Sequence, residues 1–297
     1  MQRSTYDEIL EEVNEAERWM ISLGLKIKNT RFDTAKKNFE IINKYYKSNN
    51  IDNINKVINN EIGIQSIFTC RDFVYIYENL KNFEKKSILK EIIKKSLKGP
   101  LLAKDETGRN RGRARDLFFQ LELASFLIER GIRVENFDDV QFVFDNYKFH
   151  IECKRPFAAK GMKWNSKKAY KQLKKHLIRK NDRGIVAFAV DKVIGKEKDI
   201  EDKILITQNK NALLRREDSL INEIIGRYRD LWNKIYIHRD IIGLFLFFKF
   251  KFHPKSGILS QRKGLHLYPL HPDINYYPST NRYLFESLGK ELNMRNR

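Results

Sequence analysis

An alternating segment at residues 140–154 constrains the fold of this chain more than any other part of the sequence. Within it, apolar and polar side chains take turns: Phe149, Ile151 and Cys153 on one side, Lys148, His150, Glu152 and Lys154 on the other. A period of two is typical of a strand with one apolar face. Because Val140, Phe142 and Phe144 alternate in the same way, we expect a β-hairpin of strands 140–144 and 148–154.

The turn of this hairpin sets its register. Asp145 and Asn146 both tolerate positive φ, so we expect them to form a two-residue turn. Continuing the pairing from that turn places Asp139 opposite Glu152 on the polar face, with Cβ atoms about 5 Å apart. The same alternation selects Asp139 over its neighbour Asp138, which would point towards the apolar side.

Two carboxylates that face each other across a ladder destabilise it unless a cation compensates them. Oxygen ligands of this kind suit Mg²⁺ or Mn²⁺, and Lys154 projects from the same face as Glu152. The pattern therefore indicates a candidate divalent-metal site at Asp139 and Glu152. The alternative is an ordinary hairpin with a charged face towards solvent.

A third carboxylate precedes the hairpin in the sequence. Glu122 lies within the apolar run 117–127 of a helix that we expect over 116–130 and that Gly131 ends. A lone charge in such a run is costly unless it is paired or bound to metal. Glu122 is therefore a candidate ligand or the partner of a buried Arg or Lys.

The elements around the hairpin follow a definite order. A strand is expected at 132–137, a helix at 166–180 and a fully buried strand at 184–190, which gives helix, three strands, helix, strand. A long polar helical stretch is expected from beyond 198 to about 235, and strands at 241–252 and 265–268 are expected to extend the same sheet. The fold class expected is α/β.

The first third of the chain has a different pattern. Helical apolar spacing recurs near 6–23, 33–47, 67–80 and 84–97, and Thr5 with Glu8 forms a capping box. We interpret 1–98 as a helical accessory or oligomerisation region, compatible with a homodimer. The segment 99–115 contains turn residues and four arginines and is the expected boundary with a second domain at 99–297, whose core is about 115–190. Its basic loop is either a phosphate contact or a solvated linker.

Positive charge is concentrated in one segment. The net charge of the chain is +20, and residues 153–184 contain twelve Lys or Arg against one acid, Asp182. General enrichment in lysine codons would not produce this clustering. The segment therefore indicates a polyanionic partner such as nucleic acid.

The combination of Asp139 with Glu152-Cys153-Lys154, in the middle of the helix, three strands, helix, strand order, resembles the PD-(D/E)xK nuclease superfamily over about residues 115–190. The resemblance implies a restriction-endonuclease-like core. Asp138 stands where the motif has proline, a position without a catalytic group.

What the resemblance implies can be stated residue by residue. Asp139 and Glu152 would bind Mg²⁺ or Mn²⁺ together with the backbone carbonyl of Cys153, Glu122 would add a ligand, and Lys154 would assist the attacking water. Gln172 would support the site from the second helix. The phosphate backbone would be held by basic residues in and before that helix: Arg155, Lys163, Lys167, Lys168, Lys171, Lys174 and Lys175. His150 and His176 are either surface residues or neighbours of the site.

The function expected is therefore metal-dependent hydrolysis of phosphodiester bonds, with DNA preferred over RNA on the resemblance alone. The main alternative is a non-catalytic nucleic-acid-binding protein that uses the same fold as a scaffold, and a third is an interaction protein with an acidic partner. Two cysteines, an acidic N-terminal segment and no apolar run of 18 residues indicate a reducing cytoplasm and no membrane partner.

Overall fold

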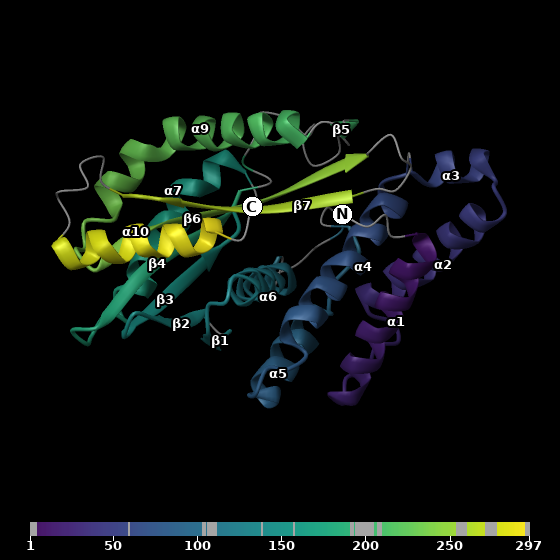
Figure 1. Ribbon diagram of the computed structural model, residues 1–297, viewed down its shortest axis with the longest axis horizontal. Coiled ribbons are helices and arrows are strands. Elements are labelled where there is room, and N and C mark those ends of the chain that lie inside the picture. The colour runs from purple at the N-terminus through teal and green to yellow at the C-terminus, as the bar shows by residue number, and fades with distance from the viewer. Residues whose placement is uncertain are drawn as a thin grey trace. The chain divides into compact units, whose positions relative to one another are not determined.

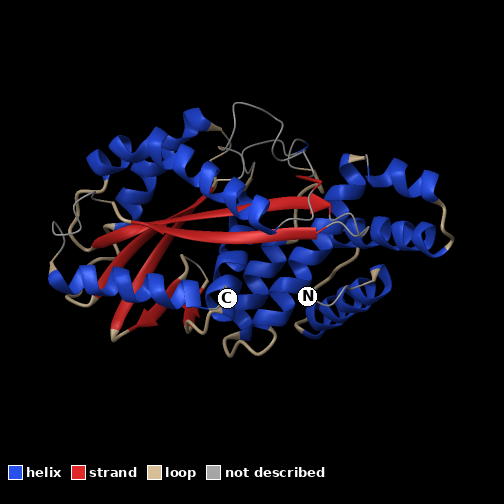
Figure 2. Cartoon of the chain, turned by 45° about the horizontal axis from the view of Figure 1, so that its top comes forward, coloured by secondary structure: helices blue, strands red, loops and turns tan. Residues whose placement is uncertain are grey.

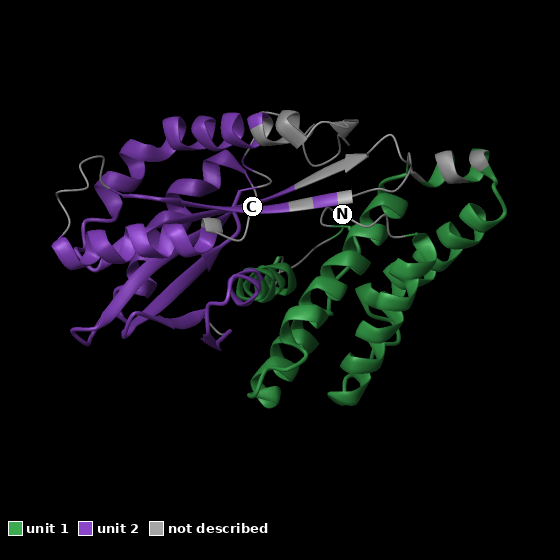
Figure 3. Ribbon diagram, in the orientation of Figure 1, with its two compact units in different colours: residues 1–125, 256–259 green, residues 126–255, 260–297 purple. Residues whose placement is uncertain are grey.

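The computed structural model describes residues 5–58, 60–102, 105, 112–137, 139–156, 158–190, 193, 205–206, 210–253, 260–270 and 278–294. Asp138 and the loop arginines Arg109 and Arg111 lie outside the described residues. The described chain forms two compact units, one up to Ser125 and one from Phe126 onward (Figure 3). This division falls within helix α6 (Arg113–Glu129), later than the segment 99–115.

The first unit is helical, as its apolar spacing predicts. Its helices before α6 are α1 (Tyr6–Ser22), α2 (Arg31–Lys47), α3 (Ile51–Ile58), α4 (Glu61–Leu80) and α5 (Lys86–Ser96). The capping box of α1 is confirmed, because the Glu8 backbone N–H donates to the Thr5 hydroxyl and the Thr5 N–H to the Glu8 carboxylate. The short helix α3 was not predicted.

The second unit is built on a mixed sheet (Figures 1 and 2). Its strands are β1 (Val134–Asn136), β2 (Gln141–Phe144), β3 (Tyr147–Lys154), β4 (Asp182–Ala189), β5 (Leu205–Ile206), β6 (Ile241–His253) and β7 (Ser260–Tyr268). Among the described residues these seven strands form one sheet in the order β1-β2-β3-β4-β6-β5, with β7 paired to β6. The α/β class, the order of the core elements and the extension of the sheet by the later strands are confirmed.

The hairpin has the predicted register. Phe144 pairs with Tyr147 and Gln141 with His150. Asp145 and Asn146 adopt φ of 49° and 62°, as a two-residue turn between twisted strands requires. The alternation of side chains and the turn residues were therefore sufficient to set this part of the fold.

The parallel strands β3, β4 and β6 are covered on both faces. Helices α7 (Met162–Leu173) and α9 (Lys210–Ile235) pack on the face that carries Val186 and Leu246. Helix α10 (Ser279–Met294) lies on the opposite face, where Phe285 approaches Gly243. The figures show these helices on the two sides of the sheet (Figures 1 and 2).

Several elements of this unit differ from expectation. Strand β5 lies in a stretch expected to be helical, and β7 begins at Ser260 rather than near residue 265. Helix α7 begins at Met162 and ends at Leu173, so it starts earlier than the predicted 166–180 and leaves His176 in the following turn. Helix α10 was not predicted. In the described part of the chain, no helix is both long enough and apolar enough to cross a membrane.

A buried polar link attaches α10 to the sheet. The Arg183 guanidinium donates from Nε to Asn281 Oδ1 at 2.6 Å, and Asn281 Nδ2 donates to the Arg239 carbonyl at 2.7 Å. Only 1% of Asn281 is exposed, so no solvent replaces these bonds. Loss of such bonds leaves buried polar groups unsatisfied.

Replacing Asn281 by Ala should therefore lower the free energy of unfolding by about 2–3 kcal/mol in urea titrations, because a hydrogen bond to a buried charged group is removed. Lys290→Ala, at an exposed position of the same helix, is the control and should stay within about 0.5 kcal/mol of the unmodified protein. Equal stability of the two variants would show that the Arg183–Asn281 link does not hold α10.

Candidate functional site

The structure brings the carboxyl groups of Asp139 and Glu152 together at one end of the hairpin. The Ile151 N–H donates to the Val140 carbonyl at 2.8 Å, which continues the register beyond the last paired residues of β2. Asp139 then leaves the ladder with φ of 51°. Its carboxyl group nevertheless remains close enough to that of Glu152 to affect its ionisation.

Glu152 is buried, with only 2% of the residue exposed. Burial raises the pKa of its carboxyl group, the Lys154 ammonium lowers it, and the Asp139 carboxyl raises it again, to a net value of about 7. Its Oε2 atom is buried and accepts no hydrogen bond within the described part of the chain. The carboxyl group is thus poised between its two protonation states near neutral pH.

Lys154 provides a positive charge at the centre of the site. Its Nζ atom donates to Glu152 Oε1 and, at 3.2 Å, to the Cys153 carbonyl oxygen. These two acceptors belong to the set of ligands predicted for a divalent ion. The ammonium group of Lys154 therefore occupies a position where a cation is stabilised.

Two stacked histidines extend the site along the sheet. His176 Nε2 lies 3.8 Å from Asp139 Oδ2, and the rings of His176 and His150 stack with centroids 5.5 Å apart. His150 Nε2 lies in turn 3.5 Å from Asp182 Oδ1. The alternation had placed His150 on the face of Glu152, but no local pattern signals the approach of His176 to Asp139.

The surroundings of His150 and Asp182 shift the pKa values of both groups. Burial lowers the pKa of His150, with Asp182 opposing the change. Burial alone would raise the pKa of Asp182, but the backbone N–H groups of Arg179 and Ile178, together with His150, bring it below its usual value. Asp182 is thus an anion that holds the turn after α7 to the start of β4.

Tyr236, which follows α9, lies on the helix side of the site, near enough to Glu152 to be affected by its charge. Its hydroxyl donates to the Ser166 carbonyl oxygen at 3.2 Å. Burial raises the pKa of this hydroxyl, and the negative charge of Glu152 raises it further, so Tyr236 remains neutral. Sequence reasoning missed Tyr236, because its approach depends on how α9 packs over α7.

The two supporting residues predicted from helices are Gln172, which is half-buried, and Glu122, which is buried, and their roles at the site stay predictions. Gln172 lies on α7, which packs against β3, and its Oε1 atom is buried without a hydrogen bond from the described residues. Glu122 is buried, with 2% exposed, in the part of α6 that belongs to the first unit. Phe126, one turn later, packs on Phe247, on the sheet face opposite to Glu152. The approach of Glu122 to the carboxyl pair stays a prediction.

The predicted basic residues form an exposed surface on and after α7. One side of the helix is buried through Met162, Ser166, Ala169 and Leu173. The exposed lysines on its other sides and in the following turn are Lys163, Lys167, Lys168, Lys171, Lys174 and Lys175. Arg155 is half-buried directly after β3.

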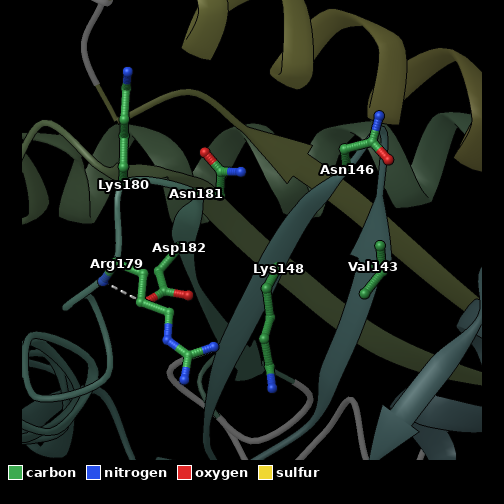
Figure 4. Close-up of a pocket in the computed structure, with 7 residues that line it drawn as sticks. All are labelled: Val143, Asn146, Lys148, Arg179, Lys180, Asn181 and Asp182. Atoms are coloured by element: carbon green, nitrogen blue, oxygen red, sulfur yellow. Dashed lines mark hydrogen bonds between the residues drawn. The ribbon is translucent and has the colours of Figure 1, made fainter.

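A hollow of about 490 Å³ lies at the other end of β3 from Glu152, and its lining includes Lys148, Arg179 and Asp182. Figure 4 shows the side chains of Lys148 and Arg179 extending to the same side, whereas Lys180 points away from them. The hollow contains none of the predicted catalytic residues. The carboxyl pair rather than the hollow is therefore the candidate for chemistry.

The donor set at the carboxyl pair fits a magnesium-type ion. Mg²⁺ is usually held by one or two carboxylates while it keeps several waters, and Glu152 Oε2 and Asp139 supply that number. Among the described residues, no three His, Cys, Asp or Glu side chains are arranged to hold a metal by themselves. Waters, a phosphate or the Cys153 carbonyl would have to complete the coordination.

Comparison with protein-family models, with curated proteins and with solved structures gives no match to this chain. The candidate site therefore rests on its residues and their geometry.

The raised pKa of Glu152 makes stability depend on pH in a defined direction. The folded state holds the proton more tightly than the unfolded state, whose carboxyl has a pKa of 4.5. The contribution of the protonated Glu152 carboxyl to the free energy of unfolding is complete below about pH 4.5 and is lost as the pH rises through about 7. The rise from 4.5 to about 7 corresponds to roughly 3 kcal/mol.

We expect Glu152→Gln to remove this pH dependence. In urea titrations with EDTA between about pH 4.5 and 8, the unfolding free energy of the unmodified protein should fall relative to that of the variant by roughly 3 kcal/mol. Glu286→Gln, an exposed carboxyl on α10, is the matched control and should follow the unmodified protein. Parallel curves for Glu152→Gln and the unmodified protein would contradict the raised pKa.

Proposed function

We propose that this chain is a metal-dependent nuclease of the PD-(D/E)xK type that hydrolyses phosphodiester bonds, preferentially in DNA, in the cytoplasm. One observation carries the proposal: a buried carboxyl group with a pKa of about 7 lies beside a second carboxyl and a lysine, on the sheet that α7 covers. Strongly perturbed ionisable groups in such clusters are typical of catalytic sites.

Asp139 and Glu152 are the residues that would hold Mg²⁺ or Mn²⁺, with the Cys153 carbonyl and Glu122 as further candidate ligands. When bound, the divalent ion supplies a lowered pKa for the attacking water and stabilises negative charge on the phosphate. Ionisation of Glu152 is required for this role, so metal affinity should increase as the pH rises through 7.

The other residues of the site act on water and on position. Lys154 lies on Glu152 and the Cys153 carbonyl, where its ammonium group can orient a water molecule by donating a hydrogen bond to it. To take up a proton from that water, Lys154 must first give up one of its own and act as the neutral amine. His176 Nε2 lies 3.8 Å from Asp139 Oδ2 and adds a charge partner to that carboxyl group when the imidazole is protonated. The exposed lysines of α7 hold phosphates without reading sequence.

One observation favours the scaffold alternative. Lys154 offsets part of the charge of Glu152 without a metal, so the carboxyl group has a counter-charge even in a protein that only binds nucleic acid. The lysines of α7 would serve that function equally well. The two functions differ in metal-dependent cleavage, which only the nuclease performs.

The first test separates ligand from catalyst. Glu152→Gln removes a charge that the metal requires, so Mn²⁺ binding in calorimetry and cleavage should both be lost. Lys154→Ala removes no ligand, so metal and DNA should still bind while turnover falls by roughly 10² or more. The substrates are plasmid, linear duplex, single-stranded DNA and RNA, each with Mg²⁺, Mn²⁺ or EDTA.

Glu286→Gln is the control for the first test and should cleave as the unmodified protein does. Cleavage by Glu152→Gln at the unmodified rate would place the nuclease centre elsewhere. Salt-sensitive DNA binding without cleavage under any metal condition would favour the scaffold function.

The second test concerns the basic surface. Replacing Lys167, Lys171 and Lys174 together by Ala should weaken DNA binding similarly for all sequences, because phosphate contacts carry no sequence information. The slope of log K against log salt should decrease in magnitude by about 0.9 for each phosphate that the variant no longer neutralises. Fluorescence anisotropy in EDTA measures both quantities.

A variant with Arg229, Lys234 and Lys290 replaced by Ala loses the same number of exposed charges elsewhere in the second unit. It should keep most of the affinity and the salt slope. An unchanged slope for the Lys167, Lys171 and Lys174 variant would show that the nucleic acid lies on another surface.

A further inference from the structure

Trp164 is placed unusually for a tryptophan. It lies on α7 with 62% of the residue exposed, whereas Trp232 is fully buried and stacks with Phe188. Trp19, the third tryptophan, is half-buried beside Tyr77. Tryptophan is seldom left this exposed unless its ring meets a partner.

The position of Trp164 on its helix directs it away from the sheet. Met162 and Ser166, two residues to either side, are both fully buried. Two residues correspond to about 200° of rotation around an α-helix, so Trp164 lies on the opposite side of α7. The ring contributes nothing to the core that α7 forms with the sheet.

The surroundings of Trp164 are basic. Lys160 and Lys168, one turn to either side, are exposed, and the Lys168 ammonium lies over the indole ring, 4.9 Å from its centroid. Asp182 is the only acidic residue between 153 and 184. Proteins that bind single-stranded nucleic acid combine aromatic rings with basic side chains in this way. The bases stack on the rings, and the phosphates contact the cations.

The helix turn that carries Trp164 also lies near the candidate site. Ser166, two residues later, accepts the hydrogen bond of Tyr236, whose hydroxyl is affected by the charge of Glu152. The first turns of α7 therefore lie at the same end of β3 as the carboxyl pair. A nucleobase held at Trp164 would therefore belong to a nucleic-acid strand that passes close to Asp139 and Glu152.

We propose that Trp164 stacks on an unpaired nucleobase, and that the substrate is single-stranded or locally unpaired nucleic acid; this rests on the proposed nuclease function. In a duplex, neighbouring bases cover the faces of each base, so an indole ring can stack only on a base that is exposed or displaced. On binding, the Lys168 ammonium would move from its position over the indole ring to a phosphate of the bound nucleic-acid strand.

Tryptophan fluorescence of the full chain in EDTA tests the proposal without cleavage. An oligothymidine strand of about 20 nucleotides, longer than typical single-strand sites, should quench the emission on binding. A duplex of equal length and heparin, a polyanion without bases, should bind in a salt-dependent manner with little quenching. Trp164→Phe should remove the quenching and keep affinity within about 3-fold, because a ring remains.

Trp164→Leu should weaken binding of the oligothymidine roughly 10-fold and that of the duplex little. Ile178→Ala is the matched control, since Ile178 is 83% exposed just after the same helix and should not alter single-strand affinity. Equal affinities of Trp164→Leu and Ile178→Ala for oligothymidine, or equal quenching by heparin, would overturn the proposal.

The outcome is distinguishable from that of the nuclease test. Quenching that disappears in Trp164→Phe, in a protein that cleaves nothing, would support base stacking and contradict the nuclease. Metal-dependent cleavage by a protein whose Trp164→Leu variant binds and cleaves single strands normally would support the nuclease and overturn the stacking.

Discussion

The burial of the Glu152 carboxyl beside that of Asp139 is the constraint on which the rest of the candidate site depends. Removing a carboxylate from water is expensive, and a second carboxyl nearby adds to the cost. The chain responds with Lys154, which binds Glu152 directly, and with a pKa near 7 that allows the proton to remain. A divalent cation would offset the negative charge of both carboxyl groups more completely than Lys154 does. This incompletely compensated charge is the physical basis of the proposed activity.

Helix α7 has a separate role on each of its sides. Its buried side covers the polar residues of β3, and it can approach closely because Gly184 of β4 has no side chain in the way of Leu173. Its exposed side carries lysines and Trp164. The helix that covers the buried Glu152 is therefore also the element that presents positive charge to solvent.

The row from Asp139 through His176 and His150 to Asp182 connects the site to the turn after α7. Asp182 accepts two backbone N–H groups of that turn and contacts His150, so its charge organises both the loop and the histidine pair. Burial of His150 lowers the pKa of its imidazole and so favours the neutral form, while Asp182 opposes this change. The same loop supplies Arg179 to the hollow beside Lys148.

Local patterns in the sequence determined the hairpin, its turn at Asp145 and Asn146, and the placement of Glu152 and Lys154 on one face, because strand alternation and turn geometry depend only on neighbouring residues. They also located the exposed lysines. Only the tertiary structure decided how much of the polar face is buried, because that depends on α7 packing over β3. The approach of His176 and Tyr236 arises from contacts between elements distant in the sequence, which no local pattern encodes. The same holds for burial, the largest cause of the raised pKa of Glu152, whereas Lys154 and Asp139 come from the hairpin segment itself.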